Sequence, residues 1–316
     1  MSLLYSSMII FYWLFLSGVI FLAGAFASRI YVTGPSGAEA CFSDGKKKSL
    51  GKTAVQYILL ISVITLLVNA VHFILHCAIM TETPLKEVFS ILPAFITKTK
   101  YGRFTILRTL FLTGIIVVSF VAVRKDQKWT NFLGGLFSFL LLVVIAMSGH
   151  QGAKGYFNLP FFLDVLHLIA VSLWIGGLFF IRPFVSALNK GACVETWGNL
   201  TSLINRFSQV ATFCVFIAAI TGISLAYFNI KSMTILTQTD YGNVLLIKLL
   251  LVGIIMILGG LNKFFVIPML NNVDLDKKPE DMKHGWKLFY SVNIEASIGF
   301  VVLLLTSFLT HLSPMG

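Results

Sequence analysis

Eight apolar stretches, separated by shorter polar segments, divide the chain. Each is long enough to cross a hydrocarbon layer about 30 Å thick as an α-helix. They lie near residues 8–32, 54–80, 102–123, 130–148, 159–181, 207–228, 242–267 and 288–311. The first stretch lacks a preceding basic segment and is too long for a signal peptide, so we interpret it as a retained span. The pattern predicts an all-α fold in which residues 1–316 form one transmembrane domain, a polytopic bundle of eight transmembrane helices.

The connection between the second and third stretches has a helical pattern of its own. Its charged residues, Lys86, Glu87, Lys98 and Lys100, lie elsewhere, and its apolar residues recur three or four positions apart: Leu85, Val88, Phe89, Leu92 and Phe95. This spacing predicts a short amphipathic helix lying on the membrane surface. A helix that docks a partner protein is the alternative interpretation.

Composition and charge support a membrane protein and give it an orientation. Of the 316 residues, 57% are hydrophobic and 12% are charged, which excludes an ordinary soluble domain. The formal net charge of +11 does not indicate nucleic-acid binding, because the basic residues lie in short loops between spans. Most of them occupy the first, third, fifth and seventh loops, so we expect both termini on the non-cytoplasmic side of the membrane. The four cysteines show no paired spacing, and a disulfide framework is not expected.

A short motif recurs at an offset of 140 residues. Residues Thr97–Arg108 align with Thr237–Lys248, and each copy begins a span with Tyr-Gly and places a cation about two turns inside it. Equal orientation of the two copies predicts two parallel four-helix halves, at about residues 1–148 and 149–316.

Five of the six histidines fall on the predicted outer side of the membrane: His72, His76, His150, His167 and His311. His72, His76 and Met80 are four residues apart in the second span, so they form one stripe on a helix. Imidazole and thioether groups are suitable ligands for copper, with thioether favouring Cu(I). The alternative is that the histidines form hydrogen bonds to neighbouring helices and that Met80 only packs against neighbouring side chains.

A second group of candidate ligands lies where the fourth span ends and the fifth begins. Met147 and His150 precede a polar turn, and Asp164 and His167 follow it. On an α-helix Asp164, His167 and Trp174 share one face. Met147, His150 and His167 are candidate copper ligands, and Asp164 would orient the His167 ring as a hydrogen-bond acceptor. The alternative is that Asp164 and Trp174 simply pack with a buried histidine. His311, near the end of the chain, would lie over the same outer group of candidate ligands or would simply be solvated.

Other charged residues lie within or beside the apolar stretches. Glu295 is predicted to lie at the level of Arg206, so a structural ion pair is the first interpretation and a proton or cation relay is the second. Arg108 and Lys248 are expected to extend their charges outward or to pair with Asp164. Gly176 and Gly177 are expected to allow close helix packing.

These residues resemble those of the copper-resistance protein D (CopD) family of bacterial inner-membrane proteins. The resemblance covers roughly residues 145 to 314 and is carried by Ser-Gly-His150, His167, Leu-Trp174-Ile-Gly-Gly177, Arg206-Phe-Ser208, Tyr241-Gly242 with Lys248, Asn262-Lys263, and Glu295-Ala296 ahead of Pro314. It implies an eight-span protein that handles copper at the cytoplasmic membrane, with roles for His150, His167 and Trp174. It also implies a periplasmic copper-binding partner, which must be a separate chain because no such domain is fused here.

The hypothesis that follows is a copper-binding membrane protein that takes copper, as Cu(I), at the outer face and moves it inward by exchange between soft ligands. The first alternative is a membrane b-type cytochrome with histidine-ligated haem. The second is an assembly factor that delivers copper without transport. The sequence has no nucleophile–base arrangement and no nucleotide-binding loop, so neither an enzyme nor an ATP-driven pump is expected.

Overall fold

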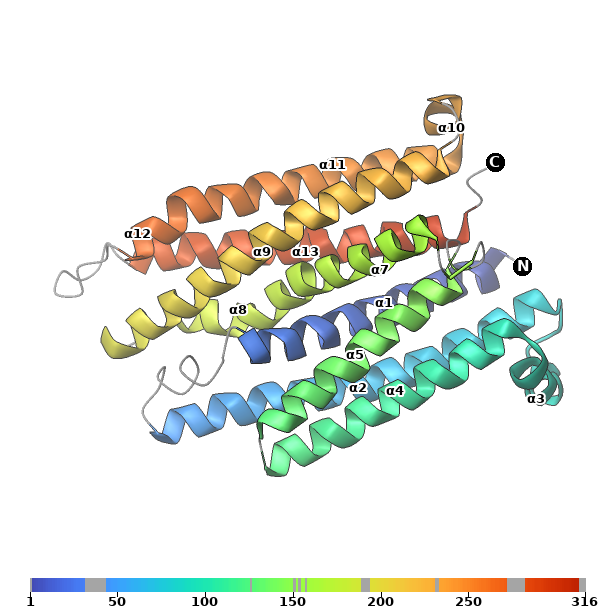
Figure 1. The fold of residues 1–316 in the computed structure, drawn as a ribbon, viewed down its shortest axis with the longest axis horizontal. Helices are drawn as coiled ribbons and strands as arrows, with labels where there is room; N and C mark the ends of the chain where they lie inside the picture. The colour runs from blue at the N-terminus through green and yellow to red at the C-terminus, as the bar shows by residue number, and fades with distance from the viewer. Residues whose placement is uncertain are drawn as a thin grey trace.

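The computed structural model describes residues 2–31, 44–125, 127–149, 152, 155–156, 158–188, 194–230, 233–271 and 282–312. This part of the chain is a bundle of long helices (Figure 1). The helical segments are α1 (Ser2–Tyr31), α2 (Asp44–Met80), α3 (Val88–Lys98), α4 (Lys100–Arg124), α5 (Lys128–Ser148), α7 (Leu159–Val171), η1 (Ser172–Gly176), α8 (Gly177–Leu188), α9 (Val194–Asn229), α10 (Met233–Gln238), α11 (Asp240–Leu261), η2 (Asn262–Val266), α12 (Ile267–Asn271) and α13 (Met282–His311).

The prediction of eight transmembrane helices is confirmed. Within the described residues, eight helices are long and apolar enough to cross a membrane, and each overlaps one of the predicted stretches. The helix between the second and third spans is confirmed as α3. Its first residue, Val88, is buried against Cys77 and Ala78 of α2, which fixes α3 to the end of that span.

The fifth and seventh spans each contain a π-helical segment that the apolar pattern did not predict. Residues of η1 interrupt the fifth span, and residues of η2 interrupt the seventh. A π-helical turn holds an extra residue and shifts the register of the side chains after it, and such turns are frequent at functional sites. Apolar residues lie on both sides of each interruption, so hydrophobicity carries no sign of it.

Helix α1 lies at the centre of the bundle, with α2, α4 and α5 on one side of it and α9, α11 and α13 on the other (Figure 1). The most apolar stretch of α1 is 61% buried within the bundle, whereas that of the span containing α11 is only 11% buried. Two glycines allow α1 to approach η1 closely. A Cβ atom on Gly176 would lie 2.1 Å from the carbonyl oxygen of Ile20, and one on Gly24 would lie 2.4 Å from that of Ser172. Gly176 therefore has the packing role expected from the sequence, and α1 contacts both predicted halves of the chain.

The two copies of the sequence repeat have the same local structure. Thr99 caps α4 by accepting a hydrogen bond from the Gly102 amide at 2.9 Å, and Thr239 caps α11 by accepting one from the Gly242 amide at 3.1 Å. A short helix precedes each cap, and both short helices lie at the same end of the bundle (Figure 1). The division into two parallel halves stays a prediction, which these matching caps support.

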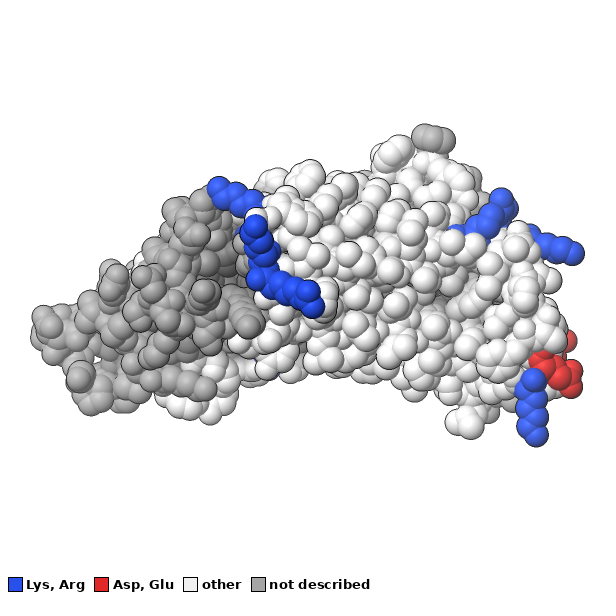
Figure 2. Space-filling model, turned by 90° about the horizontal axis from the view of Figure 1, so that it is seen from below, with Lys and Arg blue, Asp and Glu red and all other residues white. Residues whose placement is uncertain are grey.

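Both chain ends lie at the end of the bundle that carries α3 and α10, which we call the terminal end (Figure 1). The Tyr5 hydroxyl donates a hydrogen bond to the His311 carbonyl at 3.0 Å, joining the first helix to the last. Figure 2 shows the described Lys and Arg side chains of one face gathered towards its two ends, with an uncharged band between them. This distribution is typical of a bundle whose middle lies in hydrocarbon.

Candidate functional site

Three histidines from two helices lie together at the terminal end. His72 and His76 are on α2 and His311 is the last residue of α13. The ring centroid of His72 is 5.9 Å from that of His76 and 6.4 Å from that of His311. We call these three residues the histidine cluster. The sequence placed all three on one side of the membrane, but only the packing of α1 between α2 and α13 brings His311 to the other two.

Two nitrogens of this cluster have no hydrogen-bond partner. His72 is 2% exposed, and its Nδ1 lies 3.3 Å from the Tyr101 hydroxyl. The Nε2 of His72 and the Nδ1 of His76 are buried with no protein group to bond. Such an atom costs about 1–3 kcal/mol when left unsatisfied, so its presence calls for an explanation. An imidazole nitrogen with an open lone pair is the form that binds a metal ion.

Two tyrosines hold the rings of the cluster in place, and the sequence did not single out either of them. The Tyr12 ring on α1 is 5.2 Å from both His72 and His311, measured between centroids. The Tyr101 ring on α4 stacks on His76 at 3.9 Å. Tyr101 belongs to the repeated motif, which could have marked it. Tyr12 is an aromatic residue in an apolar helix, and no sequence pattern distinguishes it from packing.

Arg108 lies beside the cluster, and its side chain does not extend outward as the sequence led us to expect. It is 2% exposed rather than extended outward, and its Nη2 donates to the Ser148 hydroxyl. Its guanidinium carbon lies 5.5 Å from the centre of the Tyr101 ring, while Nε and Nη1 are buried without partners. Outward extension fails because the side chain is enclosed by helices. A fixed positive charge here would weaken the binding of any cation to the histidines.

His167 lies in a separate environment between α7 and α9. Its Nδ1 is 3.1 Å from the Ala218 carbonyl oxygen and 3.0 Å from the Thr221 hydroxyl. A proton on Nδ1 donated to the carbonyl leaves Nε2 as the acceptor nitrogen, which is the arrangement seen in metal-bound histidines. The ring is thus oriented by α9 and not by Asp164, which instead interacts electrostatically with Lys248 of α11.

The remaining predicted ligands are placed as follows. Met147 is half-buried in the last turn of α5. Gly152 lies close to its backbone, since a Cβ added to Gly152 would be 2.2 Å from the Met147 carbonyl oxygen. His150 lies outside the described residues. Met80 is 64% exposed at the end of α2, so it is not enclosed with the two histidines of its stripe. In the described part of the chain, no three or more His, Cys, Asp or Glu side chains already form a group that could hold a metal ion. The histidine cluster would therefore need side-chain rotation to converge on one ion.

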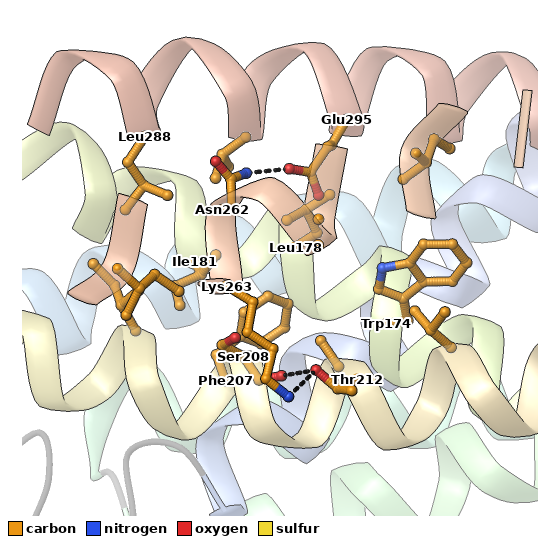
Figure 3. Close-up of a pocket in the computed structure, with 18 of the residues that line it drawn as sticks. Trp174, Leu178, Ile181, Phe207, Ser208, Thr212, Asn262, Lys263, Leu288 and Glu295 are labelled. Atoms are coloured by element: carbon orange, nitrogen blue, oxygen red, sulfur yellow. Dashed lines mark hydrogen bonds between the residues drawn. The ribbon is translucent and has the colours of Figure 1, made fainter. Parts of the chain in front are cut away.

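A cavity of about 160 Å³ lies deeper in the bundle, between α8, α9, η2 and α13. Both π-helical segments contribute to its lining, η1 through Trp174 and η2 through Asn262 and Lys263 (Figure 3). The α-helical spacing that placed Trp174 on the face of His167 is interrupted by η1, and Trp174 faces this cavity. Glu295 also lines it, 4% exposed.

Glu295 does not form the expected ion pair with Arg206. Its Oε1 accepts hydrogen bonds from the Asn262 side-chain amide and, at 3.4 Å, from the Ser291 hydroxyl. The equal depth of Glu295 and Arg206 suggested a pair, but depth alone does not set the angular position of a side chain around its helix. Sequence reasoning missed Asn262 as the partner because it lies on a neighbouring helical segment, and the sequence does not give the rotation of that segment relative to α13.

Two family models match the chain. One, described as "Copper resistance protein D-like, N-terminal domain", matches residues 3–156, and one described as "Copper resistance protein D" matches residues 202–309. The histidine pair of α2 lies in the first match and Glu295 in the second. No solved structure matches the chain.

Three curated proteins are similar to this chain. The "Copper transport protein CutJ" of Bacillus subtilis is 26% identical over 215 residues, which is 65% of this chain and 38% of that protein. The "Copper resistance protein D" of Pseudomonas syringae is 24% identical over 231 residues, 69% of this chain and 70% of that protein. The "Inner membrane protein YebZ" of Escherichia coli is 29% identical over 150 residues, 47% of each chain. The similarity thus spans less than half of the length of the first and third relatives.

Proposed function

Because the chain belongs to the copper resistance protein D family, we propose that it binds copper at the terminal end and transports the ion across the membrane. The observation that carries this proposal is the histidine cluster, in which two buried ring nitrogens have no protein partner. Two histidines four residues apart on one helix can bind one metal ion from the same face, with a further ligand from elsewhere. His311 of α13 is that further ligand.

The second step of the proposal is a route inward from the cluster. Tyr12 of the central helix α1 lies against the cluster, and α1 also packs against α5, whose last turn carries Met147. His167 and Met147 are the next proposed ligands, and His150 remains a candidate of that group from the sequence alone. Met80 receives the ion outside the cluster. Thioether and imidazole ligands support Cu(I) as the transported form. Arg108 keeps the first site weak enough for the ion to leave it.

The proposed setting is the bacterial cytoplasmic membrane, with both termini on the non-cytoplasmic side. The basic residues of the odd-numbered loops support this orientation, since the described helix ends on either side of those loops lie at the end of the bundle opposite the termini. The histidine cluster then faces the periplasm. A separate periplasmic copper-binding protein would deliver the ion there.

The experiment that tests the proposal uses purified full-length protein in liposomes loaded with a Cu(I) chelator. We expect copper supplied outside, under reducing conditions, to accumulate inside at least tenfold above protein-free liposomes, and we expect the protein itself to be colourless. Binding without accumulation would contradict transport and support a delivery factor. A Soret band in the purified protein would contradict the copper hypothesis in favour of a b-type cytochrome.

A further inference from the structure

The Glu295 cavity, which is the cavity lined by Trp174, Asn262 and Glu295, takes no part in the copper site described so far. Residues of both π-helical segments line it, Trp174 from η1 and Asn262 and Lys263 from η2 (Figure 3). Its walls are mainly apolar, and they include the Trp174 and Phe207 rings and the Met256 thioether. Aromatic faces and a thioether are groups that accept a soft cation without binding it tightly.

The two oxygens of the Glu295 carboxyl have different surroundings. Oε1 accepts both hydrogen bonds, from Asn262 and Ser291, and these donors also bond each other at 2.8 Å. Oε2 receives no hydrogen bond from the described residues and is not sealed from the cavity. It faces Gly259, where an added Cβ would lie 3.6 Å away. The network thus fixes the carboxyl through one oxygen and presents the other to the cavity.

No cation pairs with this carboxyl in the part of the chain that the structure describes. Lys263 lines the same cavity, but its Nζ donates to the Thr212 hydroxyl of α9 at 2.8 Å. Arg182 of α8 donates to Asn293 of α13. Arg29 of α1 donates to Asn131 of α5 at 2.8 Å. A carboxyl at this depth is costly as an unpaired anion, so its charge must be compensated by a proton or by a cation that enters the cavity.

We propose that Glu295 is the proton-exchanging residue of transport, a role that rests on the proposed copper transport. The carboxyl holds a proton on Oε2 while the cavity contains no cation. When Cu(I) enters, the O–H bond breaks, the proton leaves to the periplasmic side, and the carboxylate balances the charge of the ion. When the ion leaves to the cytoplasmic side, Oε2 takes up a proton from that same side. One monovalent cation is exchanged for one proton, so the charge of the cavity is constant throughout.

A hydrophobic carbodiimide tests the first half of this proposal, with labelling measured first without copper and then with Cu(I) added. Such reagents add covalently to protonated carboxyl groups in apolar surroundings. We expect mass spectrometry of the full-length protein to show an adduct on Glu295 that Cu(I) decreases at least fivefold, and that persists in Asp164→Asn. An unmodified Glu295 in the wild type would overturn the proposal, and so would labelling that Cu(I) leaves unchanged.

Proton movement tests the second half. In liposomes with a pH-sensitive dye, wild-type protein should move one proton for each Cu(I) ion. Glu295→Gln keeps an oxygen for the Asn262 and Ser291 hydrogen bonds. It should lose copper-coupled proton movement at least tenfold, while the Cu(I) affinity of the histidine cluster changes less than about twofold. Retention of coupled proton movement in this variant would overturn the role of Glu295. If the wild type binds no copper at all, the proposed function fails, and carbodiimide labelling alone still decides whether Glu295 holds a proton.

Discussion

Replacing His72 and His76 together by leucine is expected to lower the affinity for Cu(I) at least about 100-fold. Loss of one group that supports a metal ligand already costs about 10–100-fold in metal affinity, and this variant removes two of the three proposed ligands. Leucine is similar in volume to histidine and lacks polar atoms, so it fills the same space. Competition titration with a Cu(I) chelator of known affinity measures the change in the purified protein.

The same variant separates a metal site from ordinary packing. If the two histidines were structural, their loss would lower the thermal midpoint of the metal-free protein. Because two of their ring nitrogens are unsatisfied, we expect that midpoint to stay unchanged or to rise. Asn69→Ala is the matched control, since Asn69 is a buried polar residue of α2 that bonds Thr109 at 3.4 Å. Equal copper affinity in wild type and in the histidine variant would remove the cluster from the proposal.

Replacing Gly176 by alanine is expected to destabilise the bundle strongly. The new Cβ would meet the Ile20 carbonyl oxygen at 2.1 Å, and that oxygen belongs to the backbone of the central helix. Overpacking of this kind typically costs about 1–3 kcal/mol, and here α1 would have to move away from η1. Displacement of α1 also moves Tyr12 from the histidine cluster. We therefore expect a fall of several degrees in thermal midpoint together with weaker Cu(I) binding.

Gly253→Ala provides the control for this substitution. Gly253 lies on α11 with open space around its Cα, so an added methyl group meets nothing within 4 Å. Alanine is a better helix former than glycine by about 1 kcal/mol, and the control should be neutral or slightly stabilising. A Gly176→Ala protein as stable as the Gly253→Ala protein would show that α1 and η1 are not packed as described.

The eight membrane spans could be predicted because hydrocarbon thickness sets a minimum length for an apolar helix. The short helix α3 followed from its own periodicity, and the matching positions of Tyr101 and Tyr241 followed from the repeat. The two π-helical segments could not be predicted, since residues around Trp174 and Asn262 are apolar enough to continue an α-helix. The central position of α1 is a property of tertiary packing and leaves no mark on its composition.

Only those parts of the candidate site that lie on a single helix could be predicted from the sequence. Helical spacing places His72 and His76 on one face, but the meeting of His311 with them depends on where α13 crosses α1. The expected partners of Glu295 and of His167 were wrong for a related reason. The partners found instead are the Asn262 side-chain amide, which donates to Glu295, and the Ala218 carbonyl oxygen, which lies beside Nδ1 of His167. Both lie on neighbouring helices whose rotation the sequence does not state.

X-ray absorption at the copper edge of the Cu(I)-loaded protein tests the central claim most directly. The proposal predicts a first shell of nitrogen ligands with the multiple-scattering pattern of imidazole rings, lost in the variant that replaces His72 and His76 by leucine. A shell made only of sulfur, or an imidazole pattern unchanged in that variant, would contradict copper binding by the histidine cluster.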